Sequence, residues 1–250
     1  MKIFYFTSTG NNLYIAKELG GQLYSIPKLL KEGPFEFEDD KIGIIFPCYY
    51  FGTPRIVKDF IKKVKLKSDY VFAIMSYGNI SAGGTNHFIK IAENSGIKLS
   101  YINEILMIDN YLPLYDIEKQ LKNVLKKNIG KNLASIVSDI HLGKIFIKRN
   151  PLLNRISTFF AQLYYKVNIR KADKRFFVED SCNSCQVCEK VCPVDNIKVN
   201  EKPEFLHHCE ECFACIHHCP QNSIRLTNEK SRARFINEHI SLKDIIDSNN

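Results

Sequence analysis

Eight of the nine cysteines in this chain of 250 residues lie between Cys182 and Cys219. They form two copies of the pattern C-x2-C-x2-C-x3-C-P: CNSCQVCEKVCP begins at Cys182 and CEECFACIHHCP begins at Cys209. Each cysteine of the first copy recurs 27 positions later, as do the proline after the last cysteine and an isoleucine beyond it. This agreement indicates a duplicated unit. Clustered cysteines in a chain without a secretion signal favour metal binding over disulfides.

Within each copy three thiolates occupy seven residues, which suits three irons of one cubane better than the separated ligand pairs of a zinc site. The fourth cysteine lies too far along the chain to complete the same loop, so we expect it to bind the cluster of the other copy. The spacing therefore predicts two [4Fe–4S] clusters. The first has the ligands Cys182, Cys185, Cys188 and Cys219, and the second has Cys209, Cys212, Cys215 and Cys192. Two zinc ions or structural thiols are the alternative.

A second segment able to do chemistry is TSTGNN, which follows an apolar run and precedes a helix-like pattern; its residues are Thr7, Ser8, Thr9, Gly10, Asn11 and Asn12. An open α/β sheet binds its ligand at this place, beyond the carboxyl end of a strand. The segment has neither the lysine of a Walker loop nor the glycines of a dinucleotide loop. Hydroxyls, amides and the N–H groups of a helix N-terminus can still anchor a phosphate. We call residues 7–12 the phosphate loop; a hydroxyl-rich helix cap without a ligand is the alternative.

Two further loops follow later predicted strands. The second loop, PCYYFGTP (47–54), offers aromatic side chains, and the third loop, SYGNISAGG (76–84), offers three glycines that let a flat ligand approach. Loops at the carboxyl edge of one sheet converge, and a phosphate anchor with two ring-sandwiching loops suits a mononucleotide flavin. The candidate flavin-binding residues are the phosphate loop with Pro47, Cys48, Tyr49, Tyr50, Phe51, Gly52, Ser76, Tyr77, Gly78, Asn79, Gly83 and Gly84. Cys48 is either a thiol that acts beside the flavin or an ordinary packed residue.

The elements that would position these residues alternate between strand and helix patterns over the first 110 residues. Strands are predicted at 2–6, 22–26, 41–46, 70–75 and 98–108, mostly from near-continuous apolar runs. Helices are predicted at 11–19, 54–65 and 83–94, with Gly20 as a stop and Pro54 as a start. Strands that are apolar on both faces and alternate with helices predict a doubly wound α/β domain with five parallel strands over residues 1–115.

The next segment, residues 116–175, differs in composition and is called the connector below. It carries 14 basic and 4 acidic residues, against 13 and 11 in residues 1–115. One long helix, or two broken near Gly130, is predicted over 117–140, and another over 151–165. The charge is too local for a general nucleic-acid binder. A solvated amphipathic connector is favoured over contact with a membrane surface or an acidic partner.

Residues 176–228 are predicted to form a small α+β cluster domain, and 229–250 a C-terminal tail. The composition, 45% hydrophobic and 25% charged residues, is that of an ordinary globular protein. No stretch approaches the ~20 apolar residues of a membrane span, and the first apolar run breaks at Thr7, so we expect a cytoplasmic protein. Exposed cubanes are sensitive to oxygen, which suggests an anaerobic host. Both a monomer and a homodimer are compatible with the sequence.

These motifs together resemble the flavodoxin–ferredoxin fusion proteins sometimes called ferrodoxins. Flavodoxins carry T-x-T-G-x-T/N, which Thr7, Thr9, Gly10 and Asn12 match, and their ring-contacting loops map onto 47–52 and 76–84. The eight cysteines match a bacterial-type two-cluster ferredoxin. The resemblance covers 1–115 and 176–228 and implies FMN rather than FAD, a flavodoxin-like sheet, and a ferredoxin domain with pseudo-two-fold symmetry.

The favoured function is an electron carrier that passes single electrons between the two clusters and FMN and on to redox partner proteins, with no catalytic acid or base. The alternative is an FMN-dependent reductase of a small molecule that draws electrons from the clusters. It needs a proton donor, for which Tyr49, Tyr50, Tyr77, Asn79 and His87 are the candidates. A zinc-stabilised interaction protein is disfavoured by the cysteine spacing.

Overall fold

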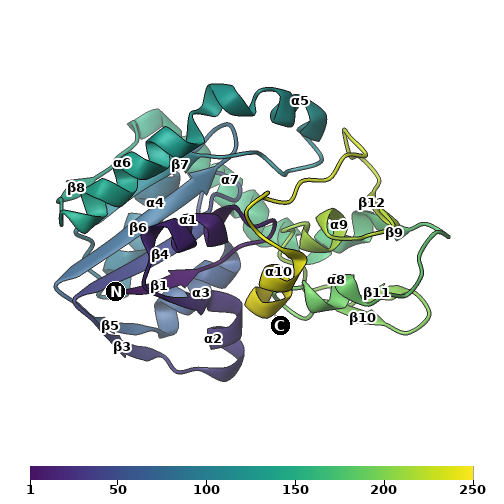
Figure 1. Cartoon of the computed structure of the whole chain (residues 1–250), viewed down its shortest axis with the longest axis horizontal. Helices are drawn as coiled ribbons and strands as arrows, with labels where there is room; N and C mark the ends of the chain where they lie inside the picture. Colours follow the sequence, from purple (N-terminus) through teal and green to yellow (C-terminus); the bar gives the residue numbers. More distant parts are fainter. Residues whose placement is uncertain (250) are drawn as a thin grey trace.

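A parallel sheet of six strands forms the larger part of the molecule (Figure 1). The computed structural model describes residues 1–249, without the side chain of Arg170. Across the sheet the order is β2-β1-β4-β6-β7-β8. The strands are β1 (Lys2–Tyr5), β2 (Gln22–Ser25), β4 (Lys41–Pro47), β6 (Tyr70–Tyr77), β7 (Tyr101–Leu106) and β8 (Phe146–Ile147). Counted along the chain this order begins 2-1-3-4-5, which is the flavodoxin-like arrangement of a doubly wound sheet.

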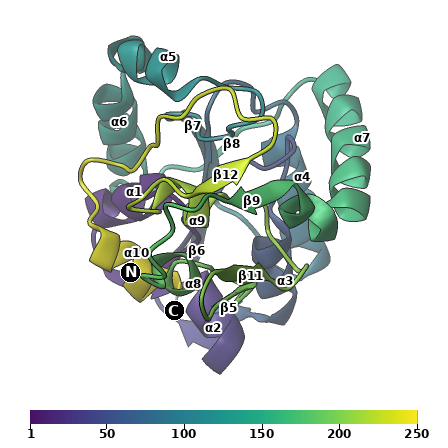
Figure 2. The ribbon, with the colours of Figure 1, turned by 90° about the vertical axis from the view of Figure 1, so that its right-hand side faces the viewer.

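Helices cover both faces of this sheet (Figure 2). Helix α1 packs beside α6 on one face, and α3 packs between α2 and α4 on the other. Their bounds are α1 (Asn11–Leu19), α2 (Ile26–Glu32), α3 (Arg55–Lys63), α4 (Gly84–Asn94) and α6 (Ile129–His141). A small parallel pair, β3 (Glu36–Glu38) and β5 (Lys65–Lys67), lies outside the main sheet. The predicted strands and helices of residues 1–108 all form, with ends shifted by up to three residues.

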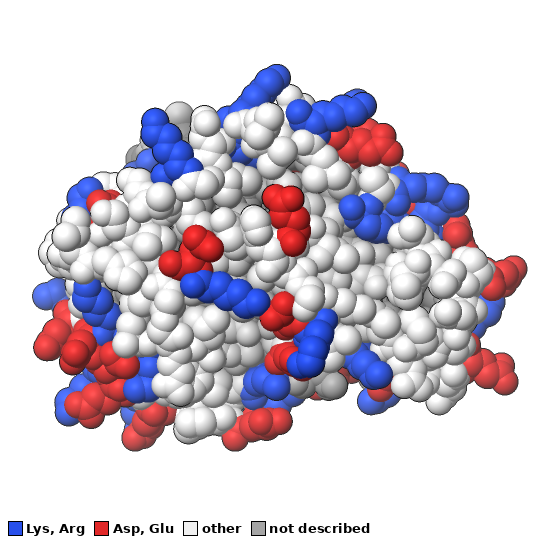
Figure 3. Space-filling view, in the orientation of Figure 1, with Lys and Arg blue, Asp and Glu red and all other residues white. Residues whose placement is uncertain are grey.

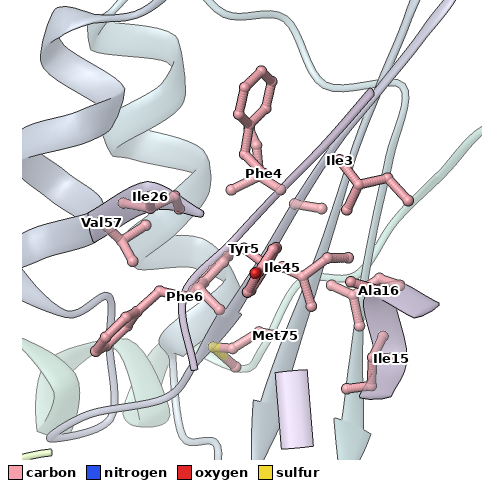
Figure 4. Packing of buried hydrophobic residues seen from close by; sticks show 14 of the residues in the cluster. Ile3, Phe4, Tyr5, Phe6, Ile15, Ala16, Ile26, Ile45, Val57 and Met75 are labelled. Carbon is pink, nitrogen blue, oxygen red and sulfur yellow. The ribbon is translucent and has the colours of Figure 1, made fainter. Parts of the chain in front are cut away.

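The sheet core is apolar on both faces, as its sequence pattern requires. Phe4 and Phe6 of the first strand segment and Ile45 of β4 are fully buried beside Met75 of β6 (Figure 4). Gly43 is needed in the middle of β4, because a Cβ there would lie 2.2 Å from the ring of Phe72 on the neighbouring strand.

The sheet has one strand more than the five predicted. The sixth, β8, pairs in parallel with β7 through Tyr101↔Phe146 and Ile102↔Ile147. A strand of two residues is too short to produce an alternating or apolar run, which explains why the sequence pattern did not show it. Together with α6, which packs against β7, it makes part of the connector a component of the α/β unit.

The rest of the connector is helical, as expected. It contains α5 (Ile117–Lys122), a 3-10 turn at Val124–Lys127, α7 (Leu152–Asn168) and a second 3-10 segment at Ile169–Arg175. Of the two alternatives for this stretch, the single long helix is wrong and the broken one is closer: α6 begins after Asn128, which adopts a left-handed conformation with φ 49°. Among the described residues, no helix combines the length and apolar character needed to cross a bilayer.

The cysteine-rich segment folds as two equivalent halves. Its helices α8 (Val187–Lys190) and α9 (Ala214–His217) stand 27 positions apart, like the sequence repeat, and so do the strands β10 (Ile197–Val199) and β12 (Ile224–Leu226). β10 pairs with β11 (Pro203–Phe205), and β12 pairs with β9 (Phe176–Val178), both antiparallel. The backbone repeats as well, because positive φ recurs at the same offset at Ser184 and Glu211, at Gln186 and Phe213, and at Asp195 and Asn222. This is a small domain of the ferredoxin type.

The cluster domain faces the carboxyl edge of the sheet, and the tail runs back across the junction between them (Figure 1). The tail ends in α10 (Leu242–Asn249), which packs against α2. Tyr5 and Ser248 share a hydrogen bond of 2.9 Å, and Asn249 Nδ2 donates to the carbonyl of Val191 in the cluster domain at 3.0 Å. The tail therefore joins both domains.

The surface carries both signs of charge in most places (Figure 3). Basic side chains line the upper edge in this view, where Figure 1 draws α5 and α6. The lower left edge, near β3 and β5, is mixed because Glu36 pairs with Lys65 and Glu38 with Lys67, both at 2.6 Å. The excess of positive charge thus lies mainly on the connector.

Candidate functional site

A cavity of about 220 Å³ opens at the carboxyl edge of the sheet, between the sheet and the cluster domain. All three loops predicted from the sequence contribute to its lining. The predicted residues found there are Thr7, Ser8, Thr9, Asn11, Asn12, Pro47, Cys48, Tyr49, Tyr50, Phe51, Ser76, Tyr77 and Gly78. The structure thus brings 13 of the 18 predicted flavin-binding residues to one cavity.

The phosphate loop links β1 to α1 and presents donors to this cavity. Gly10 has φ 99°, a conformation that suits glycine, and its N–H donates to Thr7 Oγ1 at 3.1 Å. Asn110 Nδ2 donates to both Ser8 Oγ (3.2 Å) and Thr9 Oγ1 (2.9 Å). Since these two oxygens accept a hydrogen bond from Asn110, their own O–H groups can still donate to an anion. The start of α1 adds N–H groups and the positive end of the helix dipole.

The tail covers the outer side of this loop. Asn237 N donates to the Thr9 carbonyl at 2.8 Å, and Asn237 Nδ2 donates to Asn11 Oδ1 at 3.1 Å. A Cβ on Gly10 would lie 3.0 Å from the Cβ atoms of both Asn237 and Ile240. A residue with a side chain at position 10 would therefore disturb the tail as well as the loop.

The second loop makes a tight two-residue turn. Tyr49 and Gly52 exchange both backbone hydrogen bonds, at 2.8 and 2.9 Å. Between them Tyr50 (φ 49°) and Phe51 (φ 59°) are both left-handed, which is unfavourable for aromatic residues. Such a turn persists only where surrounding contacts hold it, and strained backbone of this kind gathers at ligand sites.

Helix α7 of the connector supplies these contacts. Gln162 Nε2 donates to the carbonyls of Tyr49 (2.8 Å) and Tyr50 (3.0 Å). Thr158 Oγ1 donates to the Phe51 carbonyl at 3.0 Å and accepts from Gly83 N of the third loop at 2.8 Å. The helix therefore fixes the second and third loops together.

A fourth loop, residues 107–115, was missed by the sequence analysis. It follows β7 and lines the cavity with Met107, Ile108, Asp109, Asn110, Tyr111, Leu114 and Tyr115. The rule that identified the other loops also applies here, since this loop follows a predicted strand of the same sheet. Burial raises the pKa of the Asp109 carboxyl, which donors from Tyr111 N and Asn79 Nδ2 partly offset.

Five predicted residues, Gly10, Gly52, Asn79, Gly83 and Gly84, do not line the cavity. The glycines make room for neighbouring protein instead. A Cβ on Gly52 would lie 2.7 Å from the side chains of Gln162 and His87, and one on Gly83 would lie 2.9 Å from α7. A Cβ on Gly84 would lie 2.6 Å from Met75 Sδ. Their lack of a side chain serves the packing of α7 and α4.

Cys48 belongs to the second loop, and its Sγ lies 3.8 Å from the carbonyl oxygen of Ser81 in the third loop. Burial, with smaller contributions from Glu104 and Asp109, raises the pKa of this thiol far above its usual value. A thiol that stays protonated is a poor nucleophile and a poor metal ligand. The geometry supports the packed-residue interpretation of Cys48.

One small cavity brings together the four cysteines predicted to bind the first cluster. Cys182, Cys185, Cys188 and Cys219 line one small cavity. Burial raises the pKa of Cys188 to about 12, and the charged groups that add to this are Cys219, Cys185 and Cys182. Burial also raises the pKa of Cys215, with smaller contributions from Cys209, Cys212, Cys192 and Cys188, in that order. The described residues contain no three ligands close enough for a single ion; the thiolates of a cubane each bind a different iron.

Backbone N–H groups point at several of these sulfurs. Cys209 Sγ accepts from Glu211 N at 3.2 Å, and Cys192 and Cys219 accept from the residue four positions on, at 3.2 and 3.3 Å. Hydrogen bonds to thiolate sulfur stabilise the ligand and influence the potential of a cluster. The donor set therefore fits two [4Fe–4S] clusters.

The cluster domain also forms one wall of the main cavity. Glu211, Cys212 and Phe213 line it, together with Ala161 of α7. Cys212, a predicted cluster ligand, and the phosphate loop thus line the same cavity. No local pattern could have revealed this, because the residues lie about 200 positions apart in the sequence.

Two buried histidines hold the cluster domain against the cavity. His217 Nε2 donates to the Asn110 carbonyl at 2.9 Å, and His218 Nε2 donates to the Ser8 carbonyl at 3.0 Å. His217 Nδ1 accepts from Phe235 N, which fixes the tautomer. Burial lowers the pKa of His217 to about 3, so the ring is neutral near pH 7.

A buried carboxylate makes a second contact between the domains. Glu210 is 1% exposed and accepts from Arg55 Nε (3.0 Å), Ile56 N (3.1 Å) and Tyr165 Oη (2.9 Å). Arg55 also donates to the carbonyl of His208 at 2.9 Å. Three elements, α3, α7 and the loop of the second repeat, therefore meet at one side chain.

Comparison with known proteins identifies the smaller domain. The family model of the 4Fe–4S dicluster domain matches residues 174–221, which contain all eight clustered cysteines. The search of curated proteins gave no match. The predicted dicluster segment is confirmed by the family model.

Two solved structures are similar to the larger domain. A Bacteroides uniformis protein described as a flavoprotein shares 15% identity, covers 48% of this chain and 94% of its own, and has a TM-score of 0.32. The two-electron reduced flavodoxin of Megasphaera elsdenii shares 17% identity, covers 45% and 90%, and has a TM-score of 0.31. Scores this low carry no weight by themselves, and the flavodoxin-like fold rests on the strand order.

Proposed function

We propose that this protein transfers single electrons between two [4Fe–4S] clusters and an FMN held in one chain, and passes them on to redox partner proteins. The observation that carries the proposal is the shared cavity, which residues of the phosphate loop and Cys212 line together. The flavin and the clusters would supply the redox chemistry, and the protein positions them and sets their surroundings.

The donor set at the phosphate loop supports FMN. Hydroxyls of Ser8 and Thr9 and the first N–H groups of α1 are uncharged donors, which suit a phosphate that is only anchored. Phosphoryl transfer would require a cation at the reacting phosphate. The second, third and fourth loops supply the aromatic walls, with Tyr49, Tyr77 and Tyr111 among the residues that line the cavity.

We assign the clusters to the two cysteine groups described above, with Cys192 and Cys219 crossing between repeats. On this assignment the cluster of Cys209, Cys212, Cys215 and Cys192 is the one nearer the flavin, because Cys212 lines the shared cavity. The N–H donors at Cys209 and Cys192 would stabilise its thiolates.

A reductase of a small molecule is the second candidate, and Asp109 favours it. This carboxyl lines the cavity, and burial raises its pKa, so it keeps a proton to a higher pH than an exposed aspartate. Of the proton donors predicted from sequence, Tyr49, Tyr50 and Tyr77 line the cavity, whereas Asn79 and His87 do not. His87 accepts from Thr53 N, and burial lowers its pKa to about 4.

Anaerobic purification followed by rapid reduction tests the proposal. We expect about eight irons and one FMN per chain. Because both kinds of cofactor share one chain, the rate at which electrons redistribute after reduction should not depend on protein concentration. Zinc in place of iron, an adenine-containing flavin, or a rate that rises with concentration would contradict it. Turnover of a small molecule without a protein acceptor would favour the reductase.

Removing the Gln162 hydrogen bonds that hold the second loop should weaken flavin binding. We expect Gln162→Leu to lower FMN affinity by about tenfold, because two turn carbonyls lose their donor and the left-handed residues relax. Flavin fluorescence that appears on dilution measures the release. The iron content should stay unchanged, since the side-chain hydrogen bonds of Gln162 join it to Tyr49, Tyr50 and Lys58 and not to a cluster cysteine.

The matched control is Gln22→Leu, which makes the same change at an exposed position on β2, away from the loops. It should leave FMN affinity unaltered. Equal losses of FMN affinity in the two variants would show that the effect is not specific to the Gln162 hydrogen bonds.

The remaining proposals concern organisation and location. We divide the chain into an FMN domain (1–115), the connector (116–175), the cluster domain (176–228) and the tail (229–250). Within the connector, β8 adds the sixth strand of the sheet and α6 packs against β7. Eight cysteines kept as thiolates fit a reducing compartment, which supports a cytoplasmic location.

A further inference from the structure

Helix α7 is amphipathic, but it buries its polar side and exposes its apolar side. Its buried side chains are the polar Thr158 and Gln162 together with Tyr165, which hold the flavin loops and Glu210. Its large apolar side chains point outward and are between 47 and 79% exposed: Leu152, Leu153, Ile156, Phe159, Phe160, Leu163, Tyr164 and Val167. A helix on a globular protein normally buries such residues.

The exposed apolar residues form one continuous surface, called the α7 face below. At 3.6 residues per turn the eight side chains fall within an arc of about 140°, opposite the buried polar side. Figure 2 shows α7 at the outer edge of the molecule, beyond α4 and away from α6. Apolar surface of this extent marks a site of interaction with a protein or a membrane.

The charged side chains of the segment that contains the α7 face are all positive. Residues 142–169 contain five Lys or Arg and no Asp or Glu. Arg155 and Lys166 lie on α7 at one border of the apolar arc, and both are exposed. Phenylalanine and leucine on one face with basic residues at its border are typical of helices that lie in the surface of an anionic bilayer.

We propose that the α7 face docks on the surface of an anionic lipid bilayer, with α7 parallel to the membrane. A second copy of this chain is a poorer occupant, because it would bring another basic segment without acidic partners against Arg155 and Lys166. A bilayer that contains anionic lipid satisfies both the apolar arc and its charge.

Docking in this orientation would bring the cavity close to the membrane. Ala161 of α7 lines the cavity, and the ring of Tyr164 on the α7 face lies 5.9 Å from that of Tyr50. The same helix would therefore contact lipid on one side and hold the second and third loops on the other. A redox partner located at the membrane could then reach the site.

Flotation of the purified holoprotein with vesicles tests the proposal. We expect it to float with vesicles of phosphatidylcholine and phosphatidylglycerol, less with phosphatidylcholine alone, and less at high salt. Phe159→Asn with Phe160→Asn should reduce the bound-to-free ratio by about tenfold or more, because both rings are lost from the apolar arc. Arg155→Gln with Lys166→Gln should remove most of the preference for anionic vesicles.

The control is Leu121→Asn with Leu125→Asn, which changes two apolar side chains, 41 and 88% exposed, near α5 on the other side of the molecule (Figure 2). It should float like the wild type. Iron content and the visible spectrum confirm that each variant is folded. Wild-type protein that stays with the vesicle-free fraction at low salt would overturn the proposal, as would unchanged flotation of the Phe159 and Phe160 variant. A dimer that this variant dissociates, without vesicle binding, would assign the face to a second copy.

Discussion

Replacing Cys192 with alanine is expected to remove the cluster of the second repeat and leave that of the first. Cys192 belongs by sequence to the first repeat, but it is among the groups that raise the pKa of Cys209, Cys212 and Cys215 in the second. Bound iron should fall from about eight to about four per chain. Because the affected cluster adjoins the cavity through Cys212, electron redistribution to the flavin should slow by orders of magnitude. Iron analysis and the electron paramagnetic resonance of the reduced protein measure the result.

Cys48→Ala is the matched control, since it removes the one cysteine outside the two cluster groups. Iron content and redistribution should both remain as in the wild type. If Cys192→Ala instead removed the cluster of Cys182, Cys185 and Cys188, ligation would be local to each repeat and the crossed assignment would be wrong. Cys219→Ala should give the complementary loss.

The second large effect is expected at the buried carboxylate between the domains. Arg55→Leu leaves Glu210 buried without its cationic partner, which should lower the free energy of unfolding by about 3–5 kcal/mol. The Arg55 side chain is 25% exposed and that of Glu210 is not exposed, so solvent screens the pair only weakly. Denaturant unfolding under anaerobic conditions, followed by the visible spectrum, measures the change.

Two further variants decide whether the effect is electrostatic. Arg55→Leu combined with Glu210→Leu should recover much of the loss, because no uncompensated charge remains. Lys65→Leu, which breaks the exposed pair with Glu36, should leave the unfolding midpoint unchanged. A double variant less stable than Arg55→Leu would show that Glu210 contributes mainly through Ile56 N and Tyr165.

Most of the α/β architecture was predictable because local patterns determine it. Apolar runs bounded by polar loops gave each long strand of the sheet, and Gly20 and Pro54 gave helix ends close to those observed. Helix α2 was missed, although Ser25 caps its N-terminus and Pro27 occupies the first turn. At seven residues the helix is too short for its period to stand out.

The site was predictable only where it consists of loops that follow strands. Strand order brings the phosphate loop, second loop and third loop together, and the same reasoning would have given the fourth loop with Asp109 and Asn110. Contacts from Gln162, Glu211 and Asn237 could not be predicted, because they join parts of the chain that no periodicity relates. The solvated connector expected from sequence is only partly correct: α7 is exposed, but its polar side is structural and its apolar side is outward.

The tail over Gly10 has a consequence for how the holoprotein is assembled. Residues 1–115 leave the ribosome before the tail does, so the phosphate loop can fold while Asn237 and Ile240 are still absent. Docking of α10 on Tyr5 and Ser25 then adds the Asn237 contacts from the outer side of the loop. Because none of the described tail residues lines the cavity, this late step would tighten the phosphate loop without closing the cavity, so cofactor could still enter and leave the mature protein.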